Sequence, residues 1–165
     1  EKELEELAMK VGSDVPFFIK NKTARVGGKG NKVELVENNL KDSLILVKPL
    51  GFGVSTKDAY NSFDELDEVR YANFEKIVEC LRNDNRKDLE KYIENGLEQG
   101  ISERNADIKM FKAILNSVVP GKKFFMSGSG STYYTFVTEI ERSQIETRLR
   151  TFVDNVKIII SKTIN

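Results

Sequence analysis

A carboxylate in a stiff turn is the first candidate for chemistry. Asp14 lies in residues 12–18, which read GSDVPFF, between an amphipathic and an apolar segment. Pro16 has no amide hydrogen and biases the preceding residue toward extended geometry. A carboxylate held beside Phe17 and Phe18 would be partly desolvated, which raises its basicity and suits a general base acting on a hydroxyl group. The alternative is that Asp14 only caps the turn, where Asp is favoured anyway.

A glycine- and serine-rich loop is the second candidate. Residues 126–131 read MSGSGS and connect two apolar segments. Small residues allow close approach to the backbone, and clustered amide N–H groups form anion-binding nests. The loop is neither a Walker A sequence, since no Lys-Ser/Thr pair or helix follows directly, nor a dinucleotide fingerprint. An ordinary flexible hairpin loop is the alternative.

Two neighbouring hydroxyl residues form the third candidate. Ser55 and Thr56 follow Gly53 and Val54 shortly after an apolar strand. Hydroxyls at the start of a helix cap it or bind a phosphate, and capping is the simpler explanation. The other glycine-rich segment, residues 27–31, is expected to be a turn.

The composition restricts what these segments can do. The 165 residues include no His and a single Cys, Cys80, which we expect in the core. Ser-His-Asp and Cys-His nucleophile systems and imidazole or thiolate-cluster metal sites are excluded, and no metal ligand is predicted. Proton transfer must then use Asp, Glu, Lys or Tyr. The 26 basic and 26 acidic side chains balance, which indicates neither a nucleic-acid partner nor an anionic membrane.

Hydrophobic spacing predicts the elements that hold the candidates in the first part of the chain. Residues 1–10 form an amphipathic helix whose apolar face includes Leu4, Leu7 and Val11, and Gly12 ends it. Short strands are predicted over residues 17–19, 22–26 and 32–37. A continuous apolar strand over 44–47 is expected to be buried on both faces.

The rest of the chain predicts several helices and then strands. Helices are expected near 55–60, 74–81, 86–98, 103–119 and 140–153, and strands over 124–126, 132–137 and 156–160. The charged helices 86–98 and 139–150 are expected to present solvated faces. This order predicts an α+β fold with helices on one face of a largely antiparallel sheet. No apolar run is long enough to span a bilayer, no secretory signal is visible, and a lone Cys fits a reducing cytoplasm.

In this order and separation, the segments resemble one family. They are similar to the later part of a GHMP-type small-molecule kinase, the group of galactokinase, homoserine kinase and mevalonate kinase. The 12–18 turn and the 126–130 loop are the specific parts, and residues 28–31, 44–49 and 54–56 support them. The turn is most similar to the branch that phosphorylates a cytidine diphosphate-linked polyol during non-mevalonate isoprenoid (terpenoid) precursor synthesis.

The resemblance implies a role for each matching position. Asp14 would take the proton from the substrate alcohol. The phosphates would lie against Gly128, Ser129 and Gly130.

Further implications concern the substrate side and the partners. Ser55 and Thr56 would face the substrate. ATP and Mg²⁺ would be the cofactors, and the γ-phosphoryl group would pass to a hydroxyl in a cytoplasmic enzyme. Association through the apolar face of the first helix makes a homodimer an expectation.

The chain departs from the family pattern at its start. The family's main ATP-phosphate loop precedes the helix that leads to the Asp turn, and this sequence begins inside that helix, also without the Lys expected near the reacting hydroxyl. Asn31 replaces the usual acid of the Gly-x-Gly loop. We expect residues 1–40 to be a remnant of the N-terminal, ribosomal S5-like lobe, 41–165 to be the C-terminal kinase lobe, and this chain alone to be inactive.

Two alternatives remain open. One is another GHMP kinase, of the homoserine or mevalonate-pathway type. The other is a non-catalytic binding module with the same fold.

Overall fold

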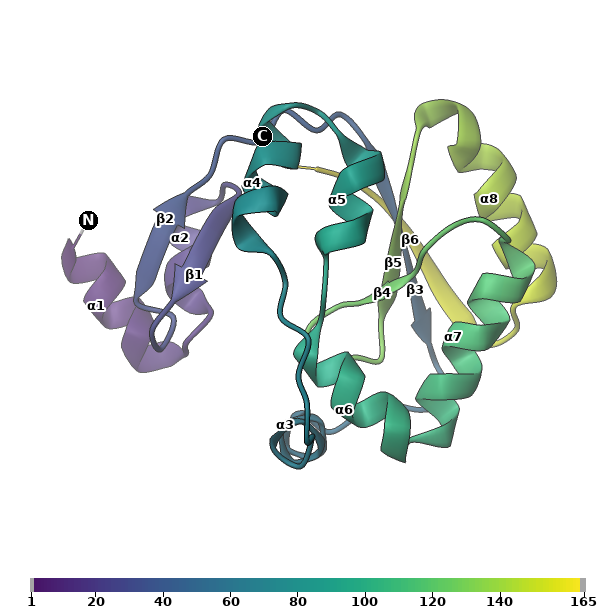
Figure 1. Ribbon diagram of the computed structural model, residues 1–165, viewed down its shortest axis with the longest axis horizontal. Coiled ribbons are helices and arrows are strands. Elements are labelled where there is room, and N and C mark those ends of the chain that lie inside the picture. The colour runs from purple at the N-terminus through teal and green to yellow at the C-terminus, as the bar shows by residue number, and fades with distance from the viewer. Residues whose placement is uncertain (1, 164–165) are drawn as a thin grey trace.

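The computed structural model describes residues 2–163, so the predicted features at residues 1, 164 and 165 lie outside the described part. The chain begins with two helices and a β-hairpin, which we call the N-terminal unit (Figure 1). Its elements are α1 (Lys2–Val11), α2 (Val15–Lys20), β1 (Ala24–Gly27) and β2 (Lys32–Leu35). The two strands pair antiparallel, with Ala24 opposite Leu35.

A four-stranded antiparallel sheet organises the rest of the described chain, with the strand order β4-β5-β3-β6. The strands are β3 (Ser43–Pro49), β4 (Phe125–Met126), β5 (Tyr133–Val137) and β6 (Val156–Lys162). Leu46 of the central strand β3 lies opposite Tyr134 on one side and Ile159 on the other. Strands far apart in sequence therefore form one sheet.

Six helices accompany this sheet: α3 (Thr56–Asp64), α4 (Phe74–Arg82), α5 (Arg86–Tyr92), α6 (Gly96–Arg104), α7 (Ala106–Val118) and α8 (Glu139–Phe152). Four of them begin at an asparagine whose side-chain oxygen accepts backbone N–H groups of the first turn; these residues are Asn73, Asn85, Asn95 and Asn105. Such caps satisfy amide groups that a helix start leaves unpaired. Each asparagine thus marks the point at which a new helix begins.

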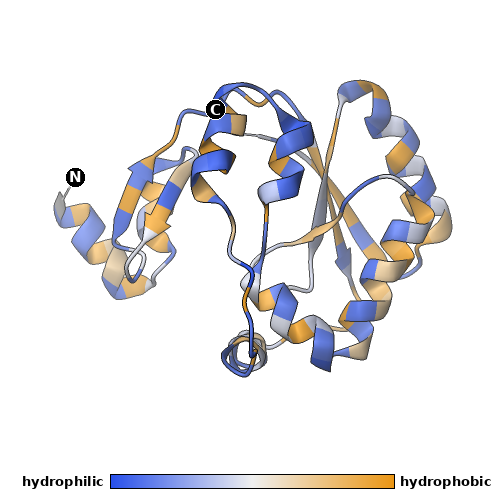
Figure 2. Cartoon of the chain, in the orientation of Figure 1, coloured by the Kyte–Doolittle hydropathy of each residue, from blue (hydrophilic) through white to orange (hydrophobic). Residues whose placement is uncertain are grey.

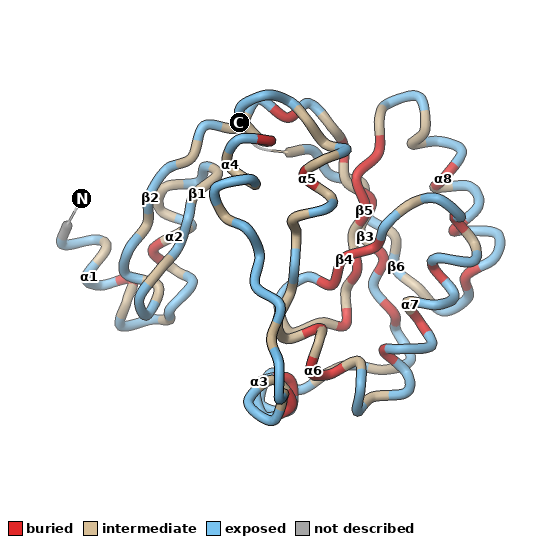
Figure 3. Tube along the Cα trace, viewed as in Figure 1, coloured by how far each residue is buried: buried red, intermediate tan, exposed pale blue. Residues whose placement is uncertain are grey.

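The core lies on both faces of the sheet (Figures 2 and 3). On one face, Ile45 and Val47 pack with apolar residues of α7 and α8. On the other face, Phe125 and Phe136 pack with Cys80 of α4 and with Leu89 of α5. The α+β class is confirmed, but helices cover both faces and not one, because side chains on both sides of β5 are apolar.

Several predicted elements differ from the structure. Residues 17–19 lie in helix α2 and not in a strand, because Pro16 occupies the first turn of a helix, where its missing amide hydrogen is tolerated. The predicted helix over 86–98 is two helices, since the chain is extended at Ile93 and a new helix starts after Asn95. Strand β3 is fully buried on one face, whereas Leu44 and Leu46 on the other are half-buried.

The N-terminal unit meets the rest of the molecule near α4. The Arg25 guanidinium lies 4.4 Å from the centre of the Phe74 ring. The Asn39 N–H donates to the Leu81 carbonyl at 2.9 Å. Within the described residues, no helix is long and apolar enough to cross a membrane.

Candidate functional site

The Asp14 carboxylate is exposed at the junction of α1 and α2. Backbone hydrogen bonds from Gly12 N to Ala8 O (3.1 Å) and from Val15 N to Gly12 O (3.2 Å) hold the junction. Asp14 occupies the N-cap position of α2, but its side chain makes no capping hydrogen bond. The expected desolvation is wrong, because Asp14 is exposed and the Phe18 side chain is 68% exposed. The carboxylate is therefore open to a ligand.

The glycine-rich hairpin turn supports this junction. Gly30 has φ +91°, and a Cβ placed there would overlap the carbonyl oxygen of Ser13. Only glycine allows this backbone conformation together with this close approach. The segment 27–31 is a turn, as predicted, and it also fixes the backbone next to Asp14.

The second candidate, residues 127–131, is an ordered loop between β4 and β5, which we call the glycine loop. Ser127 N donates to Thr132 O at 2.9 Å and Gly130 N to Ser127 O at 3.0 Å. Gly128 and Gly130 have φ values of +56° and +91°, which glycine adopts without strain. In the described part of the chain, the amides of Gly128 and Ser129 have no hydrogen-bond partner.

The third candidate lies beside the glycine loop. Ser55 is the N-cap of α3 and accepts the Asp58 N–H at 3.5 Å, so the predicted capping is confirmed. The Thr56 and Ser129 hydroxyls share a hydrogen bond of 3.1 Å. The structure thus brings together two segments that are 73 residues apart in sequence.

The first turn of α6 also contacts the glycine loop, which the sequence reasoning missed. Asn95 Nδ2 donates to the carbonyl oxygens of Met126 and Gly128, both at 2.9 Å. Glu98 Oε2 accepts the Met126 N–H at 3.1 Å, and Oε1 accepts from Lys112 Nζ at 2.6 Å. Glu98 is only 8% exposed, so the predicted solvated face is wrong here. The signal that could have revealed the contact is the Asn-Gly pair inside the predicted helix.

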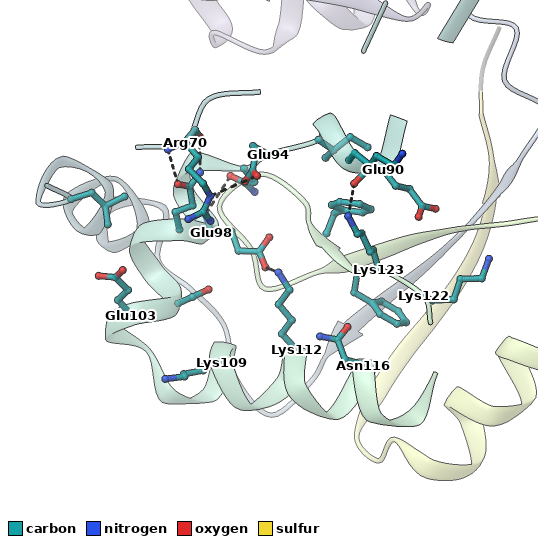
Figure 4. Close-up of a pocket in the computed structure, with 18 of the residues that line it drawn as sticks. Arg70, Glu90, Glu94, Glu98, Glu103, Lys109, Lys112, Asn116, Lys122 and Lys123 are labelled. Carbon is teal, nitrogen blue, oxygen red and sulfur yellow. Dashed lines mark hydrogen bonds and ion pairs between the residues drawn. The ribbon is translucent and has the colours of Figure 1, made fainter. Parts of the chain in front are cut away.

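A cavity of about 740 Å³ lies alongside α6, and Glu98 and Lys112 line it (Figure 4). Most of its charged groups already have partners. Arg70 pairs with Glu94 at 3.7 Å, and Lys123 donates to the Glu90 carbonyl at 3.1 Å. With both signs of charge in its wall, the cavity favours no particular ligand charge.

Two tyrosines of β5 are unsuited to accept a proton. Burial, together with the nearby Glu98 carboxylate, raises the pKa of Tyr133. The same two causes raise the pKa of Tyr134 to about 12. Both hydroxyls stay neutral near pH 7, so proton acceptance falls to other groups.

The Asp14 turn and the glycine loop lie in different parts of the molecule. Asp14 belongs to the N-terminal unit, whereas the glycine loop lies below the sheet near α3 and α6 (Figure 1). Among residues 2–163, no hydrogen bond or ion pair joins the 12–18 turn to the glycine loop.

Two curated relatives show what the chain is similar to. It is 77% identical, over all 165 residues, to a 4-diphosphocytidyl-2-C-methyl-D-erythritol kinase of Fusobacterium nucleatum subsp. nucleatum. Over its whole length the chain is similar to kinases of this name. A kinase of the same name from Clostridium botulinum is 33% identical over 150 residues, which are 87% of the chain. The resemblance predicted from the sequence is confirmed, although no family model matches.

Solved structures of kinases share the fold. A crystal structure of a 4-(cytidine 5'-diphospho)-2C-methyl-D-erythritol kinase matches 96% of the chain, with a TM-score of 0.73 and 22% identity. A homoserine kinase from Cytophaga hutchinsonii matches 81% of the chain, with a TM-score of 0.59 and 15% identity.

The chain spans about half the length of these kinases. It covers 56% of the Fusobacterium relative, 51% of the Clostridium relative and 56% of the first crystal structure. The similarity therefore concerns only about half of each of these kinases.

Proposed function

We propose that this chain is part of an ATP-dependent kinase that phosphorylates the hydroxyl of 4-diphosphocytidyl-2-C-methyl-D-erythritol in isoprenoid precursor synthesis. The observation that carries the proposal is the 77% identity, over all 165 residues, to a kinase of that name. The fold supports it, since a crystal structure with the corresponding name matches nearly the whole chain.

The division into lobes is part of the proposal. Residues 1–40 belong to the N-terminal lobe and 41–165 form the C-terminal lobe. The separate sheets of the N-terminal unit and of the remaining chain support this division.

In the proposed reaction Asp14 accepts the proton of the substrate hydroxyl as that oxygen attacks the γ-phosphorus of ATP. The bond between the γ-phosphorus and the oxygen that bridges it to the β-phosphate breaks, and ADP leaves. Phosphoryl transfer needs positioning and charge stabilisation more than covalent chemistry, so one carboxylate and a set of amides suffice. The Asp14 carboxylate supports this role, because it is exposed and makes no capping hydrogen bond to α2.

The glycine loop supplies the amides in this proposal. Gly128, Ser129 and Gly130 lie against the phosphates, and the N–H groups of the first two have no partner in the described part of the chain. Thr56, hydrogen-bonded to Ser129, and Ser55 face the substrate. Their hydroxyls orient the substrate relative to the phosphates.

The described residues do not build a protein cage for Mg²⁺. No group of three or more His, Cys, Asp or Glu side chains among them could hold a metal ion. Mg²⁺ in kinase sites is commonly held by one or two carboxylates together with substrate phosphates. In our proposal Mg²⁺ would be held mainly by the ATP phosphates and would supply neutralisation of their charge.

The partners follow from the same proposal. The substrate is a small molecule, the protein acts in the cytoplasm, and neither nucleic acid nor membrane is a partner. A homodimer through α1 is proposed as well and is tested separately below.

A substrate panel and one substitution test the function. The full-length protein containing these residues should phosphorylate the cytidine diphosphate-linked alcohol and not homoserine or mevalonate. Asp14→Asn should lower kcat about 10²–10⁴-fold with the fold intact, because a general base is lost. Unchanged turnover would remove Asp14 from the reaction. Activity on homoserine or mevalonate would favour another GHMP kinase, and no activity on any alcohol would favour a binding module.

A further inference from the structure

Asn95 connects the start of α6 to the glycine loop through all the hydrogen bonds that its side chain can make. Its Oδ1 accepts the N–H groups of Leu97 at 3.0 Å and Glu98 at 3.3 Å. Its Nδ2 donates to the carbonyl oxygens of Met126 and Gly128. An amide side chain has two donor hydrogens and an oxygen with two lone pairs, so every position is used.

The position of Asn95 is itself fixed by packing. Gly100 of α6 lies so close to α3 that an added Cβ would be 2.6 Å from the Ser62 carbonyl oxygen. At the other end of the same contact, a Cβ on Gly96 would lie 2.6 Å from the Phe63 ring. The helix that carries Asn95 is therefore held against α3, whose first residue, Thr56, contacts the loop from the other side.

Glu98 adds a second attachment from the same helical turn. Its buried carboxylate accepts the Met126 N–H, while the Lys112 ammonium of α7 compensates its charge. Both backbone polar groups of Met126 are thus bound by one turn of α6. The glycine loop leaves β4 from a point that cannot shift without breaking these bonds.

We infer that Asn95 is a positioning residue for phosphoryl transfer, because it binds the Gly128 carbonyl and thereby directs the free Ser129 N–H group, which belongs to the same peptide unit, toward the phosphates. This inference rests on the proposed function. The Gly128 carbonyl and the Ser129 N–H point to opposite sides of one planar peptide unit, so holding the carbonyl fixes the direction of this N–H. The placement of such a group decides how well it stabilises developing charge. A shift of about 1 Å in such a group costs a large factor in rate.

The substitution Asn95→Asp separates this role from helix capping. Aspartate caps a helix about as well as asparagine, so α6 keeps its start. An ionised carboxylate has no hydrogen to donate, so both bonds to the loop carbonyls are lost. Asn105→Asp is the matched control, because Asn105 caps α7 through Ile108 N and, within residues 2–163, makes no hydrogen bond to the glycine loop. Should Asn95→Asp not fold, Asn95→Ser keeps a capping oxygen and serves the same test.

The first measurement uses the 165-residue chain and does not depend on activity. We expect amide hydrogen exchange at Ser127 and Gly130 to become about tenfold faster in Asn95→Asp and to stay unchanged in Asn105→Asp, as the loss of one or two hydrogen bonds implies. Both variants should retain the wild-type circular dichroism spectrum. Unchanged loop exchange in Asn95→Asp would overturn the inference.

The second measurement uses the full-length protein. Asn95→Asp should lower kcat about tenfold or more with little change in the KM of the alcohol substrate, and Asn105→Asp should keep both constants. Faster loop exchange with unchanged kcat would overturn the positioning role. A wild-type protein that phosphorylates no alcohol would refute both the proposed function and a role for Asn95 in it, whereas the exchange result would still stand for the loop contact.

Discussion

At the scale of residues, four charged side chains form a partly buried network of ion pairs at the start of α8. Lys122 Nζ lies 2.8 Å from Glu141, and Arg86 bridges Glu141 at 3.4 Å and Asp42 at 2.9 Å. Glu141 also completes a capping box with Thr138. The network joins α5 and α8 to Asp42, the residue before β3, so its protonation affects how these segments pack.

The Glu141 carboxyl predicts a loss of stability in acid. Burial alone would raise its pKa, but hydrogen bonds from Lys122 and Thr138 lower the pKa to about 2. A folded-state pKa below the unfolded value of 4.5 stabilises the fold above pH 4.5, and this contribution is lost as the pH falls from 4.5 toward 2. Since the side chain is 36% exposed, we expect about 1 kcal/mol after solvent screening.

Urea unfolding at pH 7 and pH 3 measures this contribution. Glu141→Gln should reduce the difference in unfolding free energy between the two pH values. Glu146→Gln is the control on the same helix, since the ion-pair partner of Glu146 is Arg150, whose side chain is 57% exposed, and such a pair contributes little. Equal pH dependence in wild type and Glu141→Gln would contradict the prediction.

At the scale of elements, the packing of α3 on α6 depends on two helical glycines. Gly100 approaches the backbone of Ser62 and Phe63, and Gly96 approaches the Phe63 ring. Larger residues would separate the two helices. Their contact determines where Thr56 and Asn95 meet the glycine loop.

The substitution Gly100→Ala should destabilise the protein although alanine is the better helix former. The propensity gain is about 1 kcal/mol, whereas forcing a methyl group against the α3 backbone costs about 1–3 kcal/mol. Gly53→Ala is the control, because nothing lies within 4 Å of the added Cβ. Thermal unfolding should show a lower Tm for Gly100→Ala and no decrease for Gly53→Ala; the reverse order would contradict this account.

Local patterns predicted most elements but not the contacts between them. The apolar spacing of Ile108, Phe111 and Leu115 predicted α7, because one helical face is buried. The same reasoning failed at residues 17–19, where a short apolar run fits a strand or a helix equally well. The bond between Thr56 and Ser129 and the burial of Glu98 depend on tertiary packing, which no local spacing encodes.

At the scale of the whole molecule, the N-terminal unit leaves an apolar face on α1. Leu4, Leu7 and Val11 are 54%, 57% and 79% exposed, whereas Ala8 is buried. The helix therefore turns one small residue inward and three large ones outward, which favours association.

Self-association of the 165-residue chain is the corresponding prediction. Sedimentation velocity at increasing concentration should show dimers, and Leu7→Lys should shift the distribution toward monomer, because a charge opposes burial of this face. Ile140→Lys, at a residue 92% exposed on α8, is the control and should leave the distribution unchanged. A wild-type chain that stays monomeric at every concentration would refute the homodimer.

The central position of β3 has a consequence for how the chain is made. The register pairs Val47 with Tyr133 and with Ile158, so both neighbours of β3 are synthesised long after it. Contacts between residues so far apart in sequence form slowly, and ribosomes add only about 5–20 residues per second. The hairpin of β1 and β2 can close early, whereas β3 has no neighbouring strand to pair with until residues 133–137 have been made. The sheet that carries the glycine loop is therefore completed only after residues 156–162 have been made.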